Sequence, residues 1–474
     1  MVRAVRNLVV GFALLAPAVH AGQIELLSKA ATESDTALGA EFPRYIPPEV
    51  SADGRWVAFS STAVNLVPDQ EPNASMNLFL HDRQTGTTAL VTHASGSPTV
   101  PASGGNVLTE EYSISDDGRW IVYESTARDL VDNQVSDPWI AQVFLYDRET
   151  GVNTLLSHSI QGSSISSNDL AGSPRISGDG NWIVYESAAT DLLAGQSDTP
   201  GTRDVFLQKR ANGLRILVSR AAGTPLTAAN HSLASASADG RYAVFLSEAP
   251  NVIPGQVGGS SQVFLVDRTA GTTTLVSRAA GQTVVAGYGW SSDAAVSADG
   301  NYVVFTSIAG NLVPGQIDTN TEDYGGFEIP GTDVFLYDRA ASTTALVSHA
   351  AGSVVTAGSH ASGGVSLSAD GRYVTFTSYA DDLVPGQIDT GDHTDVFLYD
   401  RVAGTTTLVS RKAGTAATAG NNYSVSARIS EDGRWIGFLG EATDLVAGAI
   451  DTNSYADIFA PPRRRRTSNP GTPG

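Results

Sequence analysis

The chain has 474 residues and no cysteine, so no disulfide contributes to its stability. It carries 29 basic and 49 acidic residues, a formal net charge of −20 at pH 7, and a surface this acidic repels phosphate backbones. The composition therefore excludes a disulfide-stapled fold and argues against nucleic acid as a partner.

The first residues have the composition of a secretory signal peptide. The basic start MVRAVRN is followed by the short apolar run LVVGFALLAPAV and by small residues around Ala21. The apolar run is too short to span a bilayer, and no later segment predicts a membrane span. We therefore predict a signal peptide over 1–21 and an exported protein, located in the periplasm or outside the cell.

Most of the remaining chain repeats one phrase, Ser-x-Asp-Gly followed by Arg or Asn and an aromatic residue. Successive copies are 60 to 71 residues apart, with Asp-Gly pairs at Asp53-Gly54, Asp117-Gly118, Asp179-Gly180, Asp239-Gly240, Asp299-Gly300, Asp370-Gly371 and Asp432-Gly433. A long period built from strand-like segments is typical of a radial array of small sheets.

Each repeat contains four segments with the composition of strands. In the sixth repeat they are GGVSLS before the Asp-Gly turn, RYVTFTS after it, then DVFLYDR and TTTLVS. Aromatic residues recur at equivalent places in every repeat, which predicts packing between neighbouring sheets. The sequence thus predicts an all-β fold, a seven-bladed β-propeller of four-stranded antiparallel blades.

The two ends of the repeat array complement each other. The last repeat stops after Phe459 without a fourth strand, whereas IELLSK at 24–29 reads like the fourth strand TTLVSR at 273–278. We predict a propeller over 22–460, with the N-terminal strand 22–30 completing the last blade and covering its open edge. The tail 461–474, with four consecutive arginines and no apolar period, is expected to be disordered.

The loops between second and third strands carry recurrent oxygen-bearing side chains. They are Asp318, Asn320 and Asp333 in the fifth repeat, Asp389, Asp392 and Asp395 in the sixth, and Asp451, Asn453 and Asp457 in the last. Hard cations prefer such oxygens, which makes calcium the candidate cofactor. The alternative is that these side chains bond loop amides and set turns. Repeats two and four have Gln142 and Gln262 at the strand-start position.

The innermost strands of a propeller line its central channel. Two residues before the repeat serine, the chain places Glu49, Arg175 and Arg428 among small residues. These side chains can bind an anion such as a carboxylate, or they can pair with each other. In the long loop before the fifth repeat, Tyr288 and Trp290 are aromatic residues that suit a sugar or peptide ligand. We assign no catalytic residue.

The phrases SADGRYVTFTS and DVFLYDRVAGTTTLVS resemble the repeats of TolB-like β-propellers, which are relatives of WD-type repeats. The resemblance covers nearly all of 22–460 and implies the propeller fold. TolB proper carries a separate α/β domain before its propeller, which we do not expect in this chain.

A propeller fold does not by itself select an activity. In a four-stranded blade, the second-to-third loop and the loop to the next blade emerge on one face, and both are long here. We predict a monomeric, non-enzymatic binding or scaffold protein that engages a protein, peptide or glycan through this long-loop face. The alternatives are an enzyme that acts on polysaccharide or the cell envelope through carboxylates of that face or the channel, and a calcium-stabilised structural propeller.

Overall fold

The computed structural model describes residues 48–73, 75–103, 112–197, 201–220, 231–258, 260–323, 328–389, 391, 393–446 and 457–459. In these ranges all extended regular structure is β-strand. The described chain contains no helix long and apolar enough to cross a membrane. The predicted signal peptide 1–21, the predicted N-terminal strand 22–30 and the tail 461–474 lie outside the described residues.

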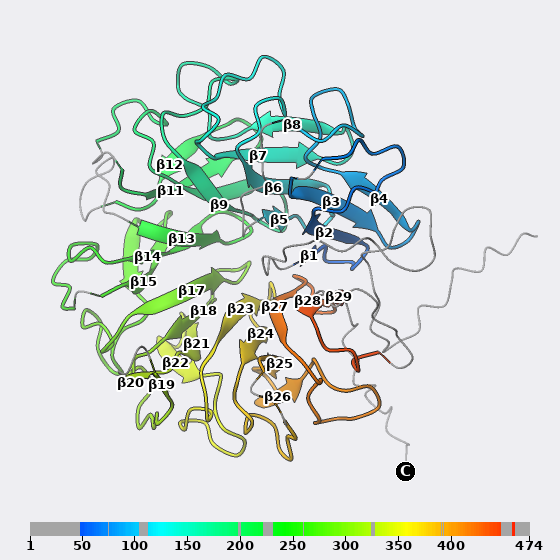
Figure 1. Ribbon diagram of the computed structural model, residues 1–474. Helices are drawn as coiled ribbons and strands as arrows, with labels where there is room; N and C mark the ends of the chain where they lie inside the picture. Colours follow the sequence, from blue (N-terminus) through cyan, green and yellow to red (C-terminus); the bar gives the residue numbers. More distant parts are fainter. Residues whose placement is uncertain are drawn as a thin grey trace, which may run out of the picture.

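The strands form small antiparallel sheets around a common axis (Figure 1). Six of them are four-stranded blades: β1 (Glu49–Val50), β2 (Trp56–Ser61), β3 (Asn77–Asp82), β4 (Thr87–Leu90); β5 (Tyr112–Ile114), β6 (Trp120–Ser125), β7 (Gln142–Asp147), β8 (Val152–Leu155); β9 (Ala171–Ile176), β10 (Trp182–Ser187), β11 (Asp204–Lys209), β12 (Arg215–Leu217); β13 (His231–Ala236), β14 (Tyr242–Ser247), β15 (Gln262–Asp267), β16 (Thr272–Leu275); β17 (Ser291–Val296), β18 (Tyr302–Ser307), β21 (Asp333–Asp338), β22 (Thr343–Leu346); and β23 (Ser362–Leu367), β24 (Tyr373–Ser378), β25 (Asp395–Asp400), β26 (Thr405–Leu408). A further sheet has three strands, β27 (Ser424–Ile429), β28 (Ile436–Gly440) and β29 (Asp457–Phe459). The long loop of the fifth blade adds a hairpin of β19 (Thr321–Asp323) and β20 (Glu328–Pro330).

The prediction of seven four-stranded blades is wrong. The described chain forms six such blades, and the sheet β27–β28–β29 between the sixth blade and the first has only three strands. The strand predicted to complete it, 22–30, is not among the described residues. Strand β29 ends at Phe459.

The first strand of each sheet is the innermost one, and these strands contact each other around the axis. Strand β1 contacts β5 on one side and β27 on the other, so the ring closes between the first blade and the three-stranded sheet. The residues predicted to face the axis occupy one register position, with Glu49 opposite Ala58 and Arg428 opposite Gly437. The ring is therefore continuous at its inner edge.

The Ser-x-Asp-Gly phrase forms the same hydrogen-bonded turn in every copy. In the first blade, Ser51 Oγ donates to Asp53 Oδ1 over 2.6 Å, and the backbone N–H of Arg55 donates to the same oxygen over 3.0 Å. The N–H of Trp56 donates to Ser51 Oγ over 2.9 Å. Gly54 has a φ of +71°, a conformation that favours glycine. The phrase is therefore a self-contained connection between the first and second strands.

Each turn glycine lies against an aromatic ring of the preceding sheet. A Cβ on Gly54 would overlap the ring of Trp435, which belongs to the three-stranded sheet. The guanidinium of Arg83 lies 4.3 Å from the centroid of that ring and donates to Gly54 O over 2.8 Å. The same stacking recurs at five other boundaries, with Arg148 over Trp56, Arg210 over Trp120, Arg268 over Trp182, Arg339 over Tyr242 and Arg401 over Tyr302.

The aromatic rows predicted from the repeats also pack within each sheet. Phe59 of β2 stacks on Phe79 of β3 with ring centroids 5.9 Å apart, and both rings are buried. Equivalent stacked pairs occur in the other sheets, at separations from 5.4 to 5.8 Å. The prediction that these rings are packing residues is confirmed, because they contact each other and leave no face exposed.

Replacing Gly54 with alanine tests the contact that closes the ring. Gly86 is a matched control, because it has the same φ of +71° but no neighbour within 4 Å of an added Cβ. Both substitutions lose about 1 kcal/mol from the left-handed backbone. We expect Gly54→Ala to lose about 1–3 kcal/mol more, from overlap with Trp435, in urea unfolding. Equal losses for the two variants would contradict this role of the aromatic ring.

Candidate functional site

The two families of long loops emerge on one face of the ring, as predicted. Isolated parallel bridges join the second-to-third loop of one blade to the loop that leaves the same blade, for example at Val257 with Val285 and at Ile317 with Thr356. We call this side of the molecule the long-loop face. The opposite side carries the short Asp-Gly turns.

A repeated glutamine shapes the second-to-third loops. In the fifth blade, Gln316 Nε2 donates to Ala309 O over 3.0 Å, and its Oε1 accepts from the N–H of Val313 over 3.3 Å. The same pair of bonds is made by Gln70, Gln134, Gln196, Gln256 and Gln387. The recurrent glutamine is therefore a structural residue of the long-loop face.

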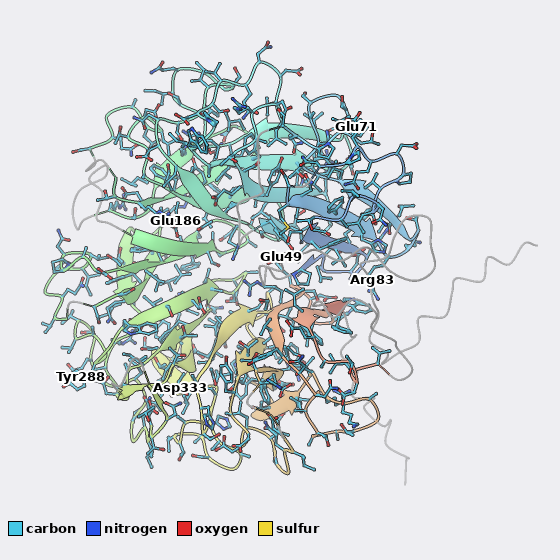
Figure 2. All side chains as sticks on the ribbon, in the orientation of Figure 1. Glu49, Glu71, Arg83, Glu186, Tyr288 and Asp333 are labelled. Carbon is cyan, nitrogen blue, oxygen red and sulfur yellow. The ribbon has the colours of Figure 1, made fainter. Side chains whose placement is uncertain are left out.

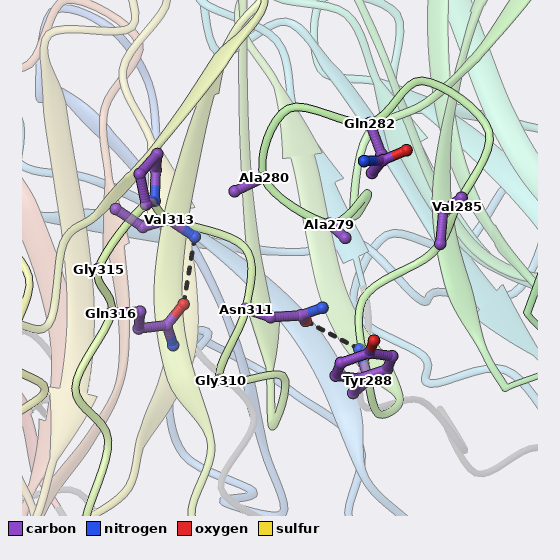
Figure 3. Close-up of a pocket in the computed structure, with 11 residues that line it drawn as sticks. Ala279, Ala280, Gln282, Val285, Tyr288, Gly310, Asn311, Val313, Gly315 and Gln316 are labelled. Atoms are coloured by element: carbon purple, nitrogen blue, oxygen red, sulfur yellow. Dashed lines mark hydrogen bonds between the residues drawn. The ribbon is translucent and has the colours of Figure 1, made fainter.

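A depression of about 630 Å³ lies on the long-loop face between the fourth and fifth blades (Figure 3). Its walls are two loop segments, 279–288 and 310–316, and no charged residue lines it. Tyr288 stands at its edge with 81% of its surface exposed. The backbone N–H of Tyr288 donates to Asn311 Oδ1 over 2.9 Å, which fixes the aromatic residue beside the depression.

At four other blade boundaries the corresponding contact has different chemistry. There a carboxylate takes the place of the Asn311 amide, as in Asp382, which accepts from the N–H of Ser359 over 2.9 Å, and Asp444, which accepts from the N–H of Asn421 over 3.0 Å. Asp129 and Asp191 make the same bond. Among these five described boundaries, the one at Tyr288 alone combines a neutral side chain with an aromatic residue.

The structure brings together three of the predicted calcium-site residues in the fifth blade, Asp318, Asn320 and Asp333, and two in the sixth, Asp389 and Asp395. Asp333 begins β21 and is fully buried, and Asn320 is 5% exposed. Burial and the nearby Asp318 carboxylate raise the pKa of Asp333 to about 8. In the sixth blade, burial and the nearby Asp389 raise the pKa of Asp395 to about 7. In both blades the loop carboxylate therefore faces the strand-start carboxylate.

The side chains of the other predicted calcium-site residues are not described by the structure. Asp392, Asp451 and Asn453 lie outside the described residues, and Asp457 begins β29 without a described side chain. Within the described ranges, no three histidine, cysteine or acidic side chains gather at metal-binding distance. Each described pair therefore supplies two carboxylates and not three.

The predicted channel residues lie at the inner edge of the ring, where Figure 2 shows Glu49 near the centre. Arg428 Nε donates to Glu49 Oε1 over 3.2 Å, which joins β27 to β1 across the closure of the ring. Arg175 lies at the equivalent position on β9, and its Nη1 donates to Pro174 O over 3.2 Å. Pairing between Glu49 and Arg428 is thus one of the two expected arrangements, and anion binding stays a prediction.

The sequence analysis missed a carboxyl pair at the axis, Asp116 and Glu431. These residues occupy the x position of the repeat phrase, which holds alanine or glycine in the other copies. The Glu431 carboxyl reaches from the three-stranded sheet to Gly178 of the third blade, where a Cβ would overlap it. Burial and the neighbouring Asp116 raise the pKa of Glu431 to about 8. The sequence signal for this pair was the presence of two acidic residues at the x position, where the other repeats have alanine or glycine.

No protein-family model matches this sequence, and no curated protein does. Among solved structures, the fold is similar to oligogalacturonate lyase from Vibrio parahaemolyticus at 12% identity, covering 93% of this chain and 96% of that one, with a TM-score of 0.47. It is also similar to the β-propeller domain of the Trilobed protease from Pyrococcus furiosus (11% identity, 89% and 93% covered, TM-score 0.47). TolB from Acinetobacter baumannii is a further similar structure (15% identity, 86% and 81% covered, TM-score 0.38), so TolB-like propellers are among the neighbours in fold.

The Glu431→Gln substitution tests the carboxyl pair at the axis. An acid whose pKa is raised by folding makes the protein less stable as pH rises, here from about 4.5 to about 8. Glutamine keeps a donor toward Asp116 and has no proton to release. We expect the variant to be about 1–2 kcal/mol more stable than the wild type at pH 8, with the difference shrinking toward pH 5.

The measurement is urea unfolding at a series of pH values, with the exposed Glu248 changed to glutamine as the control. Glu248→Gln should follow the wild-type pH dependence throughout. A Glu431→Gln difference that does not change with pH would show that the carboxyl is not held protonated.

Proposed function

We propose that this protein is an exported, non-enzymatic binding propeller that takes up a neutral carbohydrate chain on its long-loop face. The observation that carries the proposal is the exchange at the boundary between the fourth and fifth blades. There Tyr288 and Asn311 stand where four other boundaries have a small polar residue and a carboxylate; Asn65 and Asn251 hold the loop position of Asn311 in the first and fourth blades, and Tyr288 is the aromatic residue that sets this boundary apart from those four. This exchange creates an uncharged, aromatic surface on a strongly acidic protein.

The exposed ring of Tyr288 supports a sugar ligand. A flat aromatic face packs against the C–H face of a sugar ring, while the phenolic hydroxyl stays in water and can hydrogen-bond. Figure 2 shows Tyr288 at the outer edge of the ring, far from Glu49, and its ring is exposed, so a chain ligand can reach it from solvent. Trp290, at 38% exposure, adds a second partly exposed aromatic residue in the same loop.

Amide groups beside Tyr288 supply the polar half of such a site. Asn311 uses its Oδ1 to hold the backbone of Tyr288, and its Nδ2 makes no hydrogen bond with the described residues. The exposed Gln282 amide lines the same depression. Amides both donate and accept, which matches sugar hydroxyls. The open shape and the lack of charge favour a neutral glycan over an acidic or basic peptide.

The enzymatic alternative finds less support in the geometry. Glycoside hydrolases hold their two carboxyl groups about 5 Å or more apart, to leave room for the reacting sugar carbon or a water molecule. The pairs Asp116–Glu431 and Asp318–Asp333 are neighbouring carboxyl groups in partly or fully buried positions. Neither pair lines the depression, which has no carboxylate in its lining.

Two variants test the carbohydrate site against a panel of immobilised neutral oligosaccharides. Tyr288→Ala removes the ring, and Asn311→Asp introduces the carboxylate of the other boundaries while it keeps the bond to the backbone of residue 288. We expect each to weaken binding by about tenfold or more, with unchanged melting temperature.

Trp139→Ala is the matched control for these variants. Trp139 is 89% exposed in a long loop of the second blade and lines no part of the depression. The Trp139→Ala variant should bind the oligosaccharides as tightly as the wild type does. A wild-type protein that binds only charged glycans or peptides would refute a neutral-carbohydrate site at Tyr288. An equal loss of oligosaccharide binding in Trp139→Ala would refute it as well.

A further inference from the structure

We propose that the pairs Asp318–Asp333 and Asp389–Asp395 each form the core of a binding site for a hard divalent cation of the calcium class. Asn320 contributes an amide oxygen to the first of these sites. The sites lie in the fifth and sixth blades and do not depend on the carbohydrate site, because none of these five residues lines the depression.

The first step of the argument concerns the residue that begins the third strand. In six blades its side-chain oxygen accepts a hydrogen bond from a hydroxyl that lies two residues beyond the fourth strand. Ser277 Oγ donates to Gln262 Oε1 over 2.7 Å, and Ser348 Oγ donates to Asp333 Oδ1 over 2.8 Å. The same bond joins Thr92 to Asn77, Ser157 to Gln142, Ser219 to Asp204, and Ser410 to Asp395. One side-chain oxygen of the strand-start residue is thus hydrogen-bonded in the same way in blades where that residue is an amide and in blades where it is a carboxylate.

The second step concerns the other polar atom of this residue. In the fourth blade, Gln262 Nε2 donates to Ser260 Oγ and to Gly289 O, each over 2.8 Å. In the second blade, Gln142 Nε2 donates to Asp169 O over 3.2 Å. An amide therefore brings its own positive end to the surrounding oxygens. A carboxylate at the same position has only acceptors, so another positive group must take over this role.

The third step is the orphaned oxygens of the fifth blade. Asp333 is fully buried, and its Oδ2 accepts no hydrogen bond from the described residues. Asn320 is 5% exposed, and its Oδ1 is likewise without a donor among them. Leaving buried acceptors unsatisfied costs about 1–3 kcal/mol each, and more when they are charged. A bound cation satisfies both oxygens at once.

The fourth step is the second carboxylate. Asp318 and Asp389 stand two residues after the loop glutamine in the copies that begin the third strand with Asp333 and Asp395. In the two glutamine copies, the same loop position holds Ser136 or Gly258. The acidic loop residue thus occurs with the acidic strand residue and is absent beside the amide. Two facing carboxylates repel each other unless a cation or a proton lies between them.

Calcium fits this donor set better than a transition metal does. The ligands are carboxylate and amide oxygens, without histidine or cysteine, and calcium completes its six to eight ligands with carbonyls and water. Two carboxylates are few, so we expect affinities of about 10⁻⁴–10⁻³ M, as in extracellular calcium modules. The raised pKa values of Asp333 and Asp395 agree with carboxylates that lack a positive partner. A shared proton is the competing occupant.

The test grafts the amide chemistry of the second blade onto both sites. The graft variant carries Asp318→Ser, Asp333→Gln, Asp389→Ser and Asp395→Gln, which copy Ser136 and Gln142. Because this pair already occurs in a folded blade, the variant should fold and should melt at or above the wild-type temperature in EDTA. Calorimetric titration of the full chain with calcium chloride should show fewer bound ions in the variant, by the two sites removed.

Thermal unfolding gives an independent readout. We expect about 10 mM calcium to raise the wild-type melting temperature by about 2–5 °C, and the graft variant to lose most of that shift. Asp132→Asn, which removes an exposed loop carboxylate of the second blade, should keep the full shift. A wild type that binds no calcium would show that a proton occupies the pairs, and a graft variant that binds as much as the wild type would place the ions elsewhere. Either result overturns the proposal.

Discussion

The structure depends on one repeated interaction, in which an aromatic ring of one sheet is held between a turn glycine and an arginine of the next. The contact is possible only because the glycine has no Cβ, and the arginine covers the ring while it donates to the glycine carbonyl. At the closure of the ring, Trp435 makes this contact with Gly54 and Arg83. The three-stranded sheet is thereby joined to the first blade through side chains, and the Glu49–Arg428 ion pair adds a link at the inner edge.

The two faces of the molecule differ in how strongly the structure constrains the identity of their residues. On the side of the Asp-Gly turns, serine, aspartate, glycine and the aromatic residue are all engaged in hydrogen bonds or packing, so a change in any of them affects the ring. On the long-loop face, the repeated glutamine holds each loop from within, and the other loop residues are free to differ between blades. Both proposed sites lie there, where one copy acquires Tyr288 and two copies keep paired carboxylates.

The acidic residues that give the chain its net charge of −20 occur in two kinds of surroundings. Several acidic residues have ordinary structural partners, such as Asp82, which receives two hydrogen bonds from Arg55 and whose pKa is lowered to about 2. Others face a second acid, as Asp333 faces Asp318 and Glu431 faces Asp116. Paired acids destabilise the folded protein unless a proton or cation lies between them. The stability of the ring should therefore depend on pH and on cation concentration through these positions.

The sequence by itself determined the repeat, the four strands of each blade, the packing role of the aromatic rows and the common face of the long loops. These are local properties, because turn glycines and short apolar strand segments act over a few positions. It also pointed to Asp318 and Asp333, which are near each other along one loop. The count of seven four-stranded blades was wrong, because the described last sheet has three strands and pairing between distant segments is not encoded locally. Only the tertiary structure decided that Glu431 meets Asp116 across the axis, since these residues come from different sheets, and that Tyr288 lies beside Asn311, since these residues come from different loops.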